Sequence, residues 1–162
     1  MFKEMRRHKQ LLSAEETAAV LNRGTSGVLA LSGEDGYPYA VPLSYVFDGE
    51  KLYFHSAKAG HKLEALRRCP KASFCVIGQD QVVPEEYTSY YRSVIAFGTV
   101  RILEDDDEIR RAIEALSVKY APEDTPAGRD RVIDRAWDRL CILELTVDHM
   151  SGKQALELVK QD

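Results

Sequence analysis

The sequence predicts a mainly β, α+β protein, built as a small six-stranded antiparallel β-barrel with peripheral helices. Short strand-like segments follow one another with turn signals between them, which is typical of an antiparallel sheet. The order of elements is helix, three strands, helix, two strands, two helices and one strand, so the alternating βαβ rhythm of a doubly wound sheet is missing. Gly98, in the middle of the longest strand-like segment, indicates the bend or bulge with which a barrel closes.

The length and composition predict a single domain over residues 1–162. A chain of 162 residues can bury a substantial core, and a content of 44% hydrophobic and 30% charged residues is ordinary for a globular protein. We expect the domain to begin with an extended N-terminal arm (1–12) and to end in a short C-terminal tail (151–162).

Charge and cysteine content argue against several classes of protein. The net charge of -4 disfavours general nucleic-acid binding, and no apolar stretch approaches the roughly 20 residues of a membrane span. The positively charged N-terminus has no apolar segment behind it, so it does not resemble a secretory signal. Cys69, Cys75 and Cys141 are odd in number and form no CxxC pair, which indicates reduced thiols. We therefore expect a cytoplasmic protein that binds neither nucleic acid nor membrane.

The first helix is predicted at residues 13–22. Ser13 is followed three residues later by Glu16, which matches a capping box at a helix N-terminus. Arg23 and Gly24 end the helical pattern.

A meander of three strands is predicted next. Asp35-Gly36 and Asp48-Gly49 are hairpin turn signals, and they separate apolar or alternating segments. Pro42 cannot donate a hydrogen bond to a neighbouring strand, so it indicates a sheet edge, a bulge or an interruption of pairing. The three predicted strands are residues 27–31, 37–47 and 51–56.

A second helix and two more strands are expected in the middle of the chain. The helix covers residues 61–68 and is followed by a strand at 72–77. Residues 78–90 lack periodicity and predict a long loop, and the strand at 93–103 contains Gly98.

Two helices and a last strand are predicted in the C-terminal third. Four carboxylates at 105–108 begin a helix that reaches Tyr120. Carboxylates at a helix start interact favourably with the helix dipole, so we interpret them as a helix cap rather than as a metal site. Thr125 and Pro126 are a favourable N-cap and first residue for another helix. Residues 140–147 alternate as the last strand.

The segment 52–70 carries the main functional signal, because it leads from a strand through a loop into a basic helix. Positions 58–71 contain five Lys and Arg against one Glu, within an acidic protein. Free N–H groups at the helix start could bind a phosphate, with added donors from Ser56, His61 and Lys62. The alternative is a strand–turn–helix junction with a solvated basic face.

Other motifs are missing or weak. No GxGxxG, Walker, GxSxG or HExxH signature occurs. His55 and His61 lie six residues apart without a third ligand, so no metal site is predicted. Phe54 and His55 fall on opposite strand faces, so His55 is expected to point away from the core, as a solvated side chain or as a group that donates a proton near neutral pH.

Two motifs together resemble the pyridoxamine-phosphate-oxidase-like flavin-binding split barrels, and in particular their nitroimidazole-resistance (Nim-like) branch. The first is FHSA at 54–57 followed by GHKL at 60–63, and the second is YRSVIAFGTV at 91–100. The similarity extends to VPLSY at 41–45, to MRR at 5–7 and to SGK at 151–153.

The resemblance implies a homodimer that holds FMN, or in some members FAD, at the subunit interface. It implies backbone contacts to the flavin ring from 41–44, a phosphate clamp formed by Ser56, His61 and Lys62, and His55 as the candidate catalytic residue. Arg92 and Lys153 are implied as flavin or partner-subunit contacts. The full set of implied cofactor-binding residues is Val41, Pro42, Leu43, Ser44, Phe54, His55, Ser56, His61, Lys62, Arg92 and Lys153.

The implied activity is reduction of a small organic substrate, with nitro-aromatic compounds as one class, by electrons from NAD(P)H. Basic substrate-phosphate motifs of true pyridoxamine-phosphate oxidases are missing, so vitamin B6 oxidation is not expected. The alternative is a non-catalytic flavin- or haem-binding module for storage or sensing, in which His55 or His61 would be an axial haem ligand.

Overall fold

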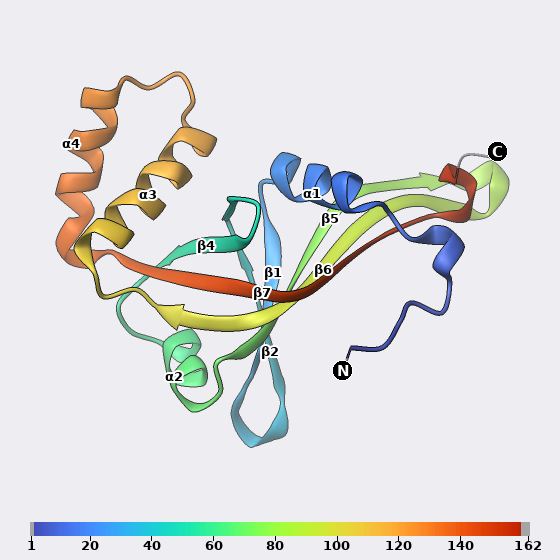
Figure 1. Ribbon diagram of the computed structural model, residues 1–162, viewed down its shortest axis with the longest axis horizontal. Helices are drawn as coiled ribbons and strands as arrows, with labels where there is room; N and C mark the ends of the chain where they lie inside the picture. The colour runs from blue at the N-terminus through green and yellow to red at the C-terminus, as the bar shows by residue number, and fades with distance from the viewer. Residues whose placement is uncertain (1, 160–162) are drawn as a thin grey trace.

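The computed structural model describes residues 2–159 as one antiparallel sheet with four α-helices around it (Figure 1). The strands are β1 (Gly27–Ser32), β2 (Pro38–Leu43), β3 (Val46–Phe47), β4 (Lys51–Ser56), β5 (Lys71–Val83), β6 (Thr88–Ile102) and β7 (Cys141–Gln154). The helices are α1 (Ala14–Arg23), α2 (His61–Arg68), α3 (Asp106–Tyr120) and α4 (Pro126–Ala136). None of the helices in this part of the chain is long and apolar enough to span a membrane.

The sheet is a barrel that stays open along one seam. Its strand order is β2-β1-β5-β6-β7-β4-β3, so β2 and β3 form the two edges. Only Ser44 and Tyr45 separate these strands in the sequence, and therefore the sheet must curl until its two edges meet. The predicted split barrel is confirmed, with seven strands in the described residues instead of six, because the expected strand 37–47 breaks at this connection. Pro42 lies on an edge strand, as its missing donor predicts.

The two predicted hairpins form but do not pair with each other. β1 pairs with β2 and β3 pairs with β4, with the turns at Gly36 and Gly49 at positive φ. The simple three-strand meander was therefore wrong: β5, β6 and β7 lie between the two hairpins. Because β5, β6 and β7 are longer than the hairpin strands, pairing with them gives each hairpin more inter-strand hydrogen bonds than pairing with the other hairpin would.

The loop predicted at residues 78–90 is wrong, because these residues belong to a long hairpin. β5 continues to Val83, a 3-10 turn covers Pro84–Glu86, and β6 begins at Thr88. The side chains here are largely exposed, so hydrophobic periodicity is missing although every strand residue except Gly78, at a bulge, has a backbone partner. The predicted irregularity at Gly98 is confirmed by a register shift between Phe97 and Gly98.

The C-terminal tail also begins later than expected. Ser151–Gln154 belongs to β7 and pairs with β6, and Lys153 also bridges to Leu11 of the N-terminal arm. Backbone pairing on both sides holds this segment extended, which its sequence did not indicate. Met1 and residues 160–162 of the predicted arm and tail lie outside the described residues.

The barrel core is built around three buried rings. Phe74 makes edge-on contacts of 4.9 Å between ring centroids with both Tyr45 and Phe54. The Tyr45 hydroxyl donates a 2.6 Å hydrogen bond to the Leu21 carbonyl, which fixes α1 to the barrel.

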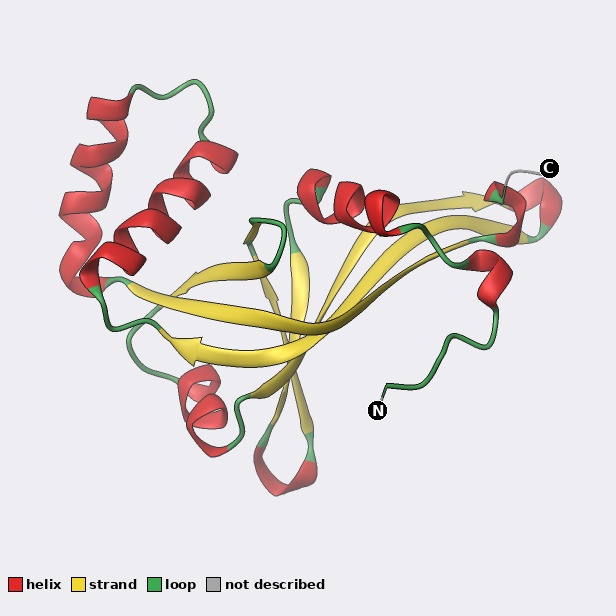
Figure 2. Ribbon diagram, viewed as in Figure 1, coloured by secondary structure: helices red, strands yellow, loops and turns green. Residues whose placement is uncertain are grey.

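The caps of the helices are those that the sequence predicts. Ser13 and Glu16 form the capping box of α1, Asp105 caps α3, and Thr125 caps α4. α3 and α4 form a helical hairpin beside β4 and β7 (Figure 2), with a small second core below α3.

Candidate functional site

The strand–loop–helix unit of β4 and α2 has the predicted geometry. Phe54 is fully buried in the barrel core, whereas the next residue, His55, is exposed. The chain then turns at Gly60, whose φ of 120° suits glycine, and α2 begins at His61. The expected opposite orientation of Phe54 and His55 is confirmed.

Ser56 carries an unusual buried oxygen at the end of β4. Its Oγ atom has no hydrogen-bond partner among the described residues although it is shielded from solvent. A buried hydroxyl without a partner is costly, and such groups in native proteins often await a ligand or water. Ser56 therefore marks a place where a bound ligand with a hydrogen-bond acceptor would satisfy a buried hydroxyl of the protein.

Positive charge converges on the same end of β4. Cys141 of β7 lies directly opposite Ser56. Burial raises the pKa of the Cys141 thiol, and the positive charges of Arg67, Lys58 and Lys62 oppose that increase. These three cations therefore act on Cys141, the strand partner of Ser56, and positive charge at this end of β4 favours an anion.

The N-terminus of α2 adds backbone donors to this basic cluster. The first N–H groups of a helix have no acceptor within the helix, and the helix dipole is positive there. A Cβ atom built on Gly60 would have no heavy atom within 4 Å, so the approach to the helix start is open. Orphaned Ser56, three cations and a helix N-terminus together fit the phosphate of a cofactor.

Strand β2 lies beside this helix start. The rings of Tyr39 and His61 are 6.3 Å apart, and a cavity of about 340 Å³ that both residues line separates the β1–β2 turn from α2. Val41 and Leu43 pack against the core, whereas Pro42 and Ser44 are exposed. From the predicted segment 41–44, a ligand could thus contact backbone groups and the side chains of Pro42 and Ser44. Tyr39 was missed by sequence reasoning, because its alternating strand gave no sign that it faces α2.

Arg92 and Lys153 lie on neighbouring strands, on opposite faces of the sheet, and away from the other predicted site residues. The Arg92 Nε atom donates a 3.3 Å hydrogen bond to Gln154, and the Lys153 amine lies 5.6 Å from the centre of the Tyr91 ring. The end of β6 nearest to α2 is marked by Thr99, which pairs with Lys71, just after α2. Arg92 is about 23 Å from Thr99 along the same strand. Within one chain these two residues therefore do not meet the basic cluster.

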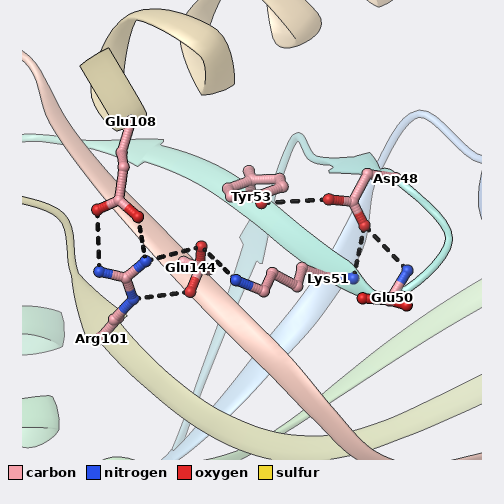
Figure 3. A network of polar contacts seen from close by, with 7 residues as sticks. All are labelled: Asp48, Glu50, Lys51, Tyr53, Arg101, Glu108 and Glu144. Atoms are coloured by element: carbon pink, nitrogen blue, oxygen red, sulfur yellow. Dashed lines mark hydrogen bonds and ion pairs between the residues drawn. The ribbon is translucent and has the colours of Figure 1, made fainter. Parts of the chain in front are cut away.

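A second polar cluster, shown in Figure 3, ties α3 to the sheet. Glu144 is 3% exposed and binds Arg101 at 2.7 Å and Lys51 at 3.1 Å. Arg101 also binds Glu108 at the start of α3. All of these charges are paired with one another, so the cluster is explained by its structural role.

A family comparison identifies the chain more closely than its geometry does. The family model described as pyridoxamine 5'-phosphate oxidase matches residues 13–154. The chain belongs to this family. The match covers β1–β7 and therefore includes the whole β4–α2 unit.

Solved structures share the fold of this family member. A conserved hypothetical protein from Mycobacterium tuberculosis has a TM-score of 0.82 at 22% identity, over 98% of this chain and 95% of that one. A candidate 5-nitroimidazole antibiotic resistance protein from Bacteroides thetaiotaomicron has a TM-score of 0.76 at 21% identity, over 89% and 86%. A FAD and haem binding protein from Mycobacterium smegmatis has a TM-score of 0.73 at 24% identity, over 95% and 77%. No curated protein matches the sequence.

Proposed function

We propose that this protein is a flavin-binding oxidoreductase, with FMN as the expected cofactor and FAD as the alternative. The observation that carries the proposal is the shielded, unpartnered Ser56 hydroxyl, whose strand partner Cys141 feels the positive charges of Lys58, Lys62 and Arg67. Membership of the pyridoxamine 5'-phosphate oxidase family supports it, as does the named FAD ligand of the M. smegmatis protein.

Each residue of the β4–α2 unit has a part in the proposed site. The phosphate clamp would consist of Ser56, Lys62 and the backbone and side chain of His61. A bound flavin would accept and pass on electrons. His55 is exposed on the strand face opposite Phe54, where its imidazole could donate a hydrogen bond or a proton to a substrate.

We propose a homodimer with the flavin at the subunit interface. The sheet offers an uncharged outer face across the neighbouring strands β1, β5 and β6, formed by Val28, Ala30, Ser73, Cys75, Ile95 and Phe97 in neighbouring register. Val28, Ile95 and Phe97 are 39%, 40% and 36% exposed, so these apolar side chains would be buried by a second copy. Arg92 and Lys153 of one subunit would then contribute to the site of the other.

The proposed reaction is reduction of a small organic molecule, with NAD(P)H as the electron donor. A nitro-aromatic substrate is the first class to try, because of the name of the Bacteroides protein. We place the reaction in the cytoplasm, since Cys69, Cys75 and Cys141 are all free thiols.

A second candidate is a haem- or flavin-binding module without turnover. The name of the M. smegmatis protein includes haem, and exposed His55 and His61 flank the loop before α2. An absorption spectrum of the purified protein separates the two cofactors, because oxidised flavin gives two visible bands and haem gives one intense Soret band. NAD(P)H oxidation with a nitro-aromatic acceptor then separates an enzyme from a binding module.

The clamp is tested by Lys62→Ala, with Lys9→Ala on the N-terminal arm as an exposed control. Loss of a charge-assisted hydrogen bond should weaken FMN binding about tenfold to a hundredfold. Fluorescence titration of cofactor-free protein measures the affinity, and circular dichroism checks the fold. An unchanged FMN affinity in Lys62→Ala would overturn the clamp, and a wild-type protein that binds no flavin would overturn the function.

A further inference from the structure

A second candidate site is a cavity that lies apart from the phosphate clamp, although one of its lining residues, Leu11, bridges to Lys153. It lies between the N-terminal arm and the outer face of β6 and β7, and its volume is about 690 Å³. This arm cavity shares no lining residue with the phosphate clamp or with β2. Its volume falls within the usual range of small-molecule sites in proteins, about 300–1,000 Å³.

Three aromatic rings from both walls meet in the arm cavity. Phe97 and His149 are directly opposite each other on β6 and β7. From the arm, the Phe2 ring lies 4.8 Å from the His149 ring, with only 13° between their planes, and 5.3 Å from the Phe97 ring. The chain's own Phe2 therefore demonstrates that the sheet presents a stacking surface to a flat ring at this place.

The rest of the lining also suits a flat and polarisable molecule. Met5 and Met150 bring thioethers, which make favourable contacts with aromatic ring edges. His8 and His149 bring imidazole nitrogens that can donate or accept a hydrogen bond. Lys3 and Glu4 are the formally charged lining residues, and their opposite charges leave no preference for an ionic ligand.

We propose that the arm cavity is a binding site for an uncharged, planar aromatic small molecule. The ligand occupies the cavity beside the stacked Phe2 ring, in contact with Phe97 and His149 on the sheet and with Phe2 as a wall on the arm side. Because the first eleven residues supply most of this lining, the arm is part of the binding site and not only a connection to α1 (Figure 1). The site does not use the phosphate clamp, but it shares Phe97 with the outer face of the proposed homodimer, so a second copy seated on Phe97 would exclude the ligand.

The four histidines make the proposal testable by proton NMR. Only His8, His55, His61 and His149 occur in the chain, and their imidazole C2–H signals can be assigned with single His→Gln variants. The probe is 2-naphthol, titrated into the protein as purified, and the comparison compound is its saturated analogue, decahydro-2-naphthol. We expect 2-naphthol to shift the His8 and His149 signals through its ring current, and the saturated compound to bind more weakly.

Variants determine where and how the probe binds. Phe97→Leu keeps apolar bulk but removes a ring, and Phe2→Ala removes the wall on the arm; each should weaken binding at least about threefold. Tyr87→Ala removes a ring that is 99% exposed at the β5–β6 turn, and it should leave the affinity unchanged. Absence of His8 and His149 shifts would overturn the proposal, and it is the result expected if a second copy of the chain fills the cavity. Equal binding of both compounds, or shifts that Phe97→Leu leaves unchanged, would also overturn it.

Discussion

Two buried polar groups illustrate how a single residue can serve binding or stability. Ser56 has no partner for its hydroxyl, so its burial lowers stability until a ligand arrives. Glu144 is only 3% exposed, but Arg101 and Lys51 satisfy both of its oxygens. The Ser56 hydroxyl is thus free to bind a ligand, whereas the hydrogen-bonding capacity of Glu144 is already used within the fold.

Acid should weaken the fold through Glu144. Burial alone would raise the pKa of this carboxyl, but the hydrogen bonds from Arg101 and Lys51 outweigh burial and hold its pKa below the usual range. A carboxyl with a lowered pKa in the folded state stabilises the protein fully above the unfolded pKa, about 4.3 for Glu. This stabilisation should be lost as the pH falls below that value and through the folded-state pKa.

Urea unfolding at several pH values measures this effect. Glu144→Gln should cost about 1–3 kcal/mol at pH 7, because Arg101 and Lys51 lose their charged acceptor while both remain partly in contact with water. Glu157→Gln, exposed near the C-terminus, is the control. If the wild type and Glu144→Gln show the same decline in acid, the carboxyl has been assigned the wrong role.

At the scale of elements, helix α3 holds the seam of the barrel. Its last residue, Tyr120, accepts a 2.8 Å hydrogen bond from the Tyr45 backbone N–H and contacts the carbonyl oxygen of Thr25. The Lys119 amine lies 4.0 Å from the centre of the Tyr45 ring, and burial lowers the pKa of this amine. The connection between the two sheet edges is thus secured by a helix far along the chain.

Tyr120→Phe should therefore destabilise the protein. The Tyr45 N–H would lose its acceptor, which costs about 1–3 kcal/mol for a buried group. Urea denaturation gives the free energy of unfolding. Tyr90→Phe is the matched control, because it removes a hydroxyl that bonds only to exposed Glu86, and we expect less than about 0.5 kcal/mol from it. A Tyr120→Phe protein as stable as this control would show that the seam closes without the helix.

At the scale of the whole molecule, the uncharged outer face is the feature that a monomer does not explain. Helix α2 and the α3–α4 hairpin cover other parts of the barrel, and Val28, Ile95 and Phe97 stay partly exposed together. Such a contiguous apolar patch on a sheet is typical of an interface.

A charge on this face should separate the subunits of the proposed dimer. Ile95→Asp would place an unpaired carboxylate in the middle of the interface, where desolvation without a partner is costly. Light scattering during size-exclusion chromatography should then report a monomer. Val132→Asp, on exposed α4, should remain dimeric. A wild-type monomer, or an Ile95→Asp dimer, would contradict the proposed interface.

The local parts of this protein could be predicted from the sequence by itself. Caps such as Ser13 with Glu16, turns such as Asp48-Gly49, and the opposite faces of Phe54 and His55 depend on neighbours within a few residues. The basic loop before α2 was visible for the same reason. Backbone geometry and side-chain spacing are sufficient at this range.

Only the tertiary structure decided which distant segments meet. Residues 78–90 are extended because the two halves of the segment pair with each other, and residues 151–154 are extended because β6 pairs with them; neither cause leaves an apolar pattern. The break at Ser44–Tyr45 requires both sheet edges and Tyr120, which is 75 residues from Tyr45. The unpartnered Ser56 oxygen and the rings of the arm cavity likewise arise from contacts between segments far apart in the chain, where burial and register determine the outcome.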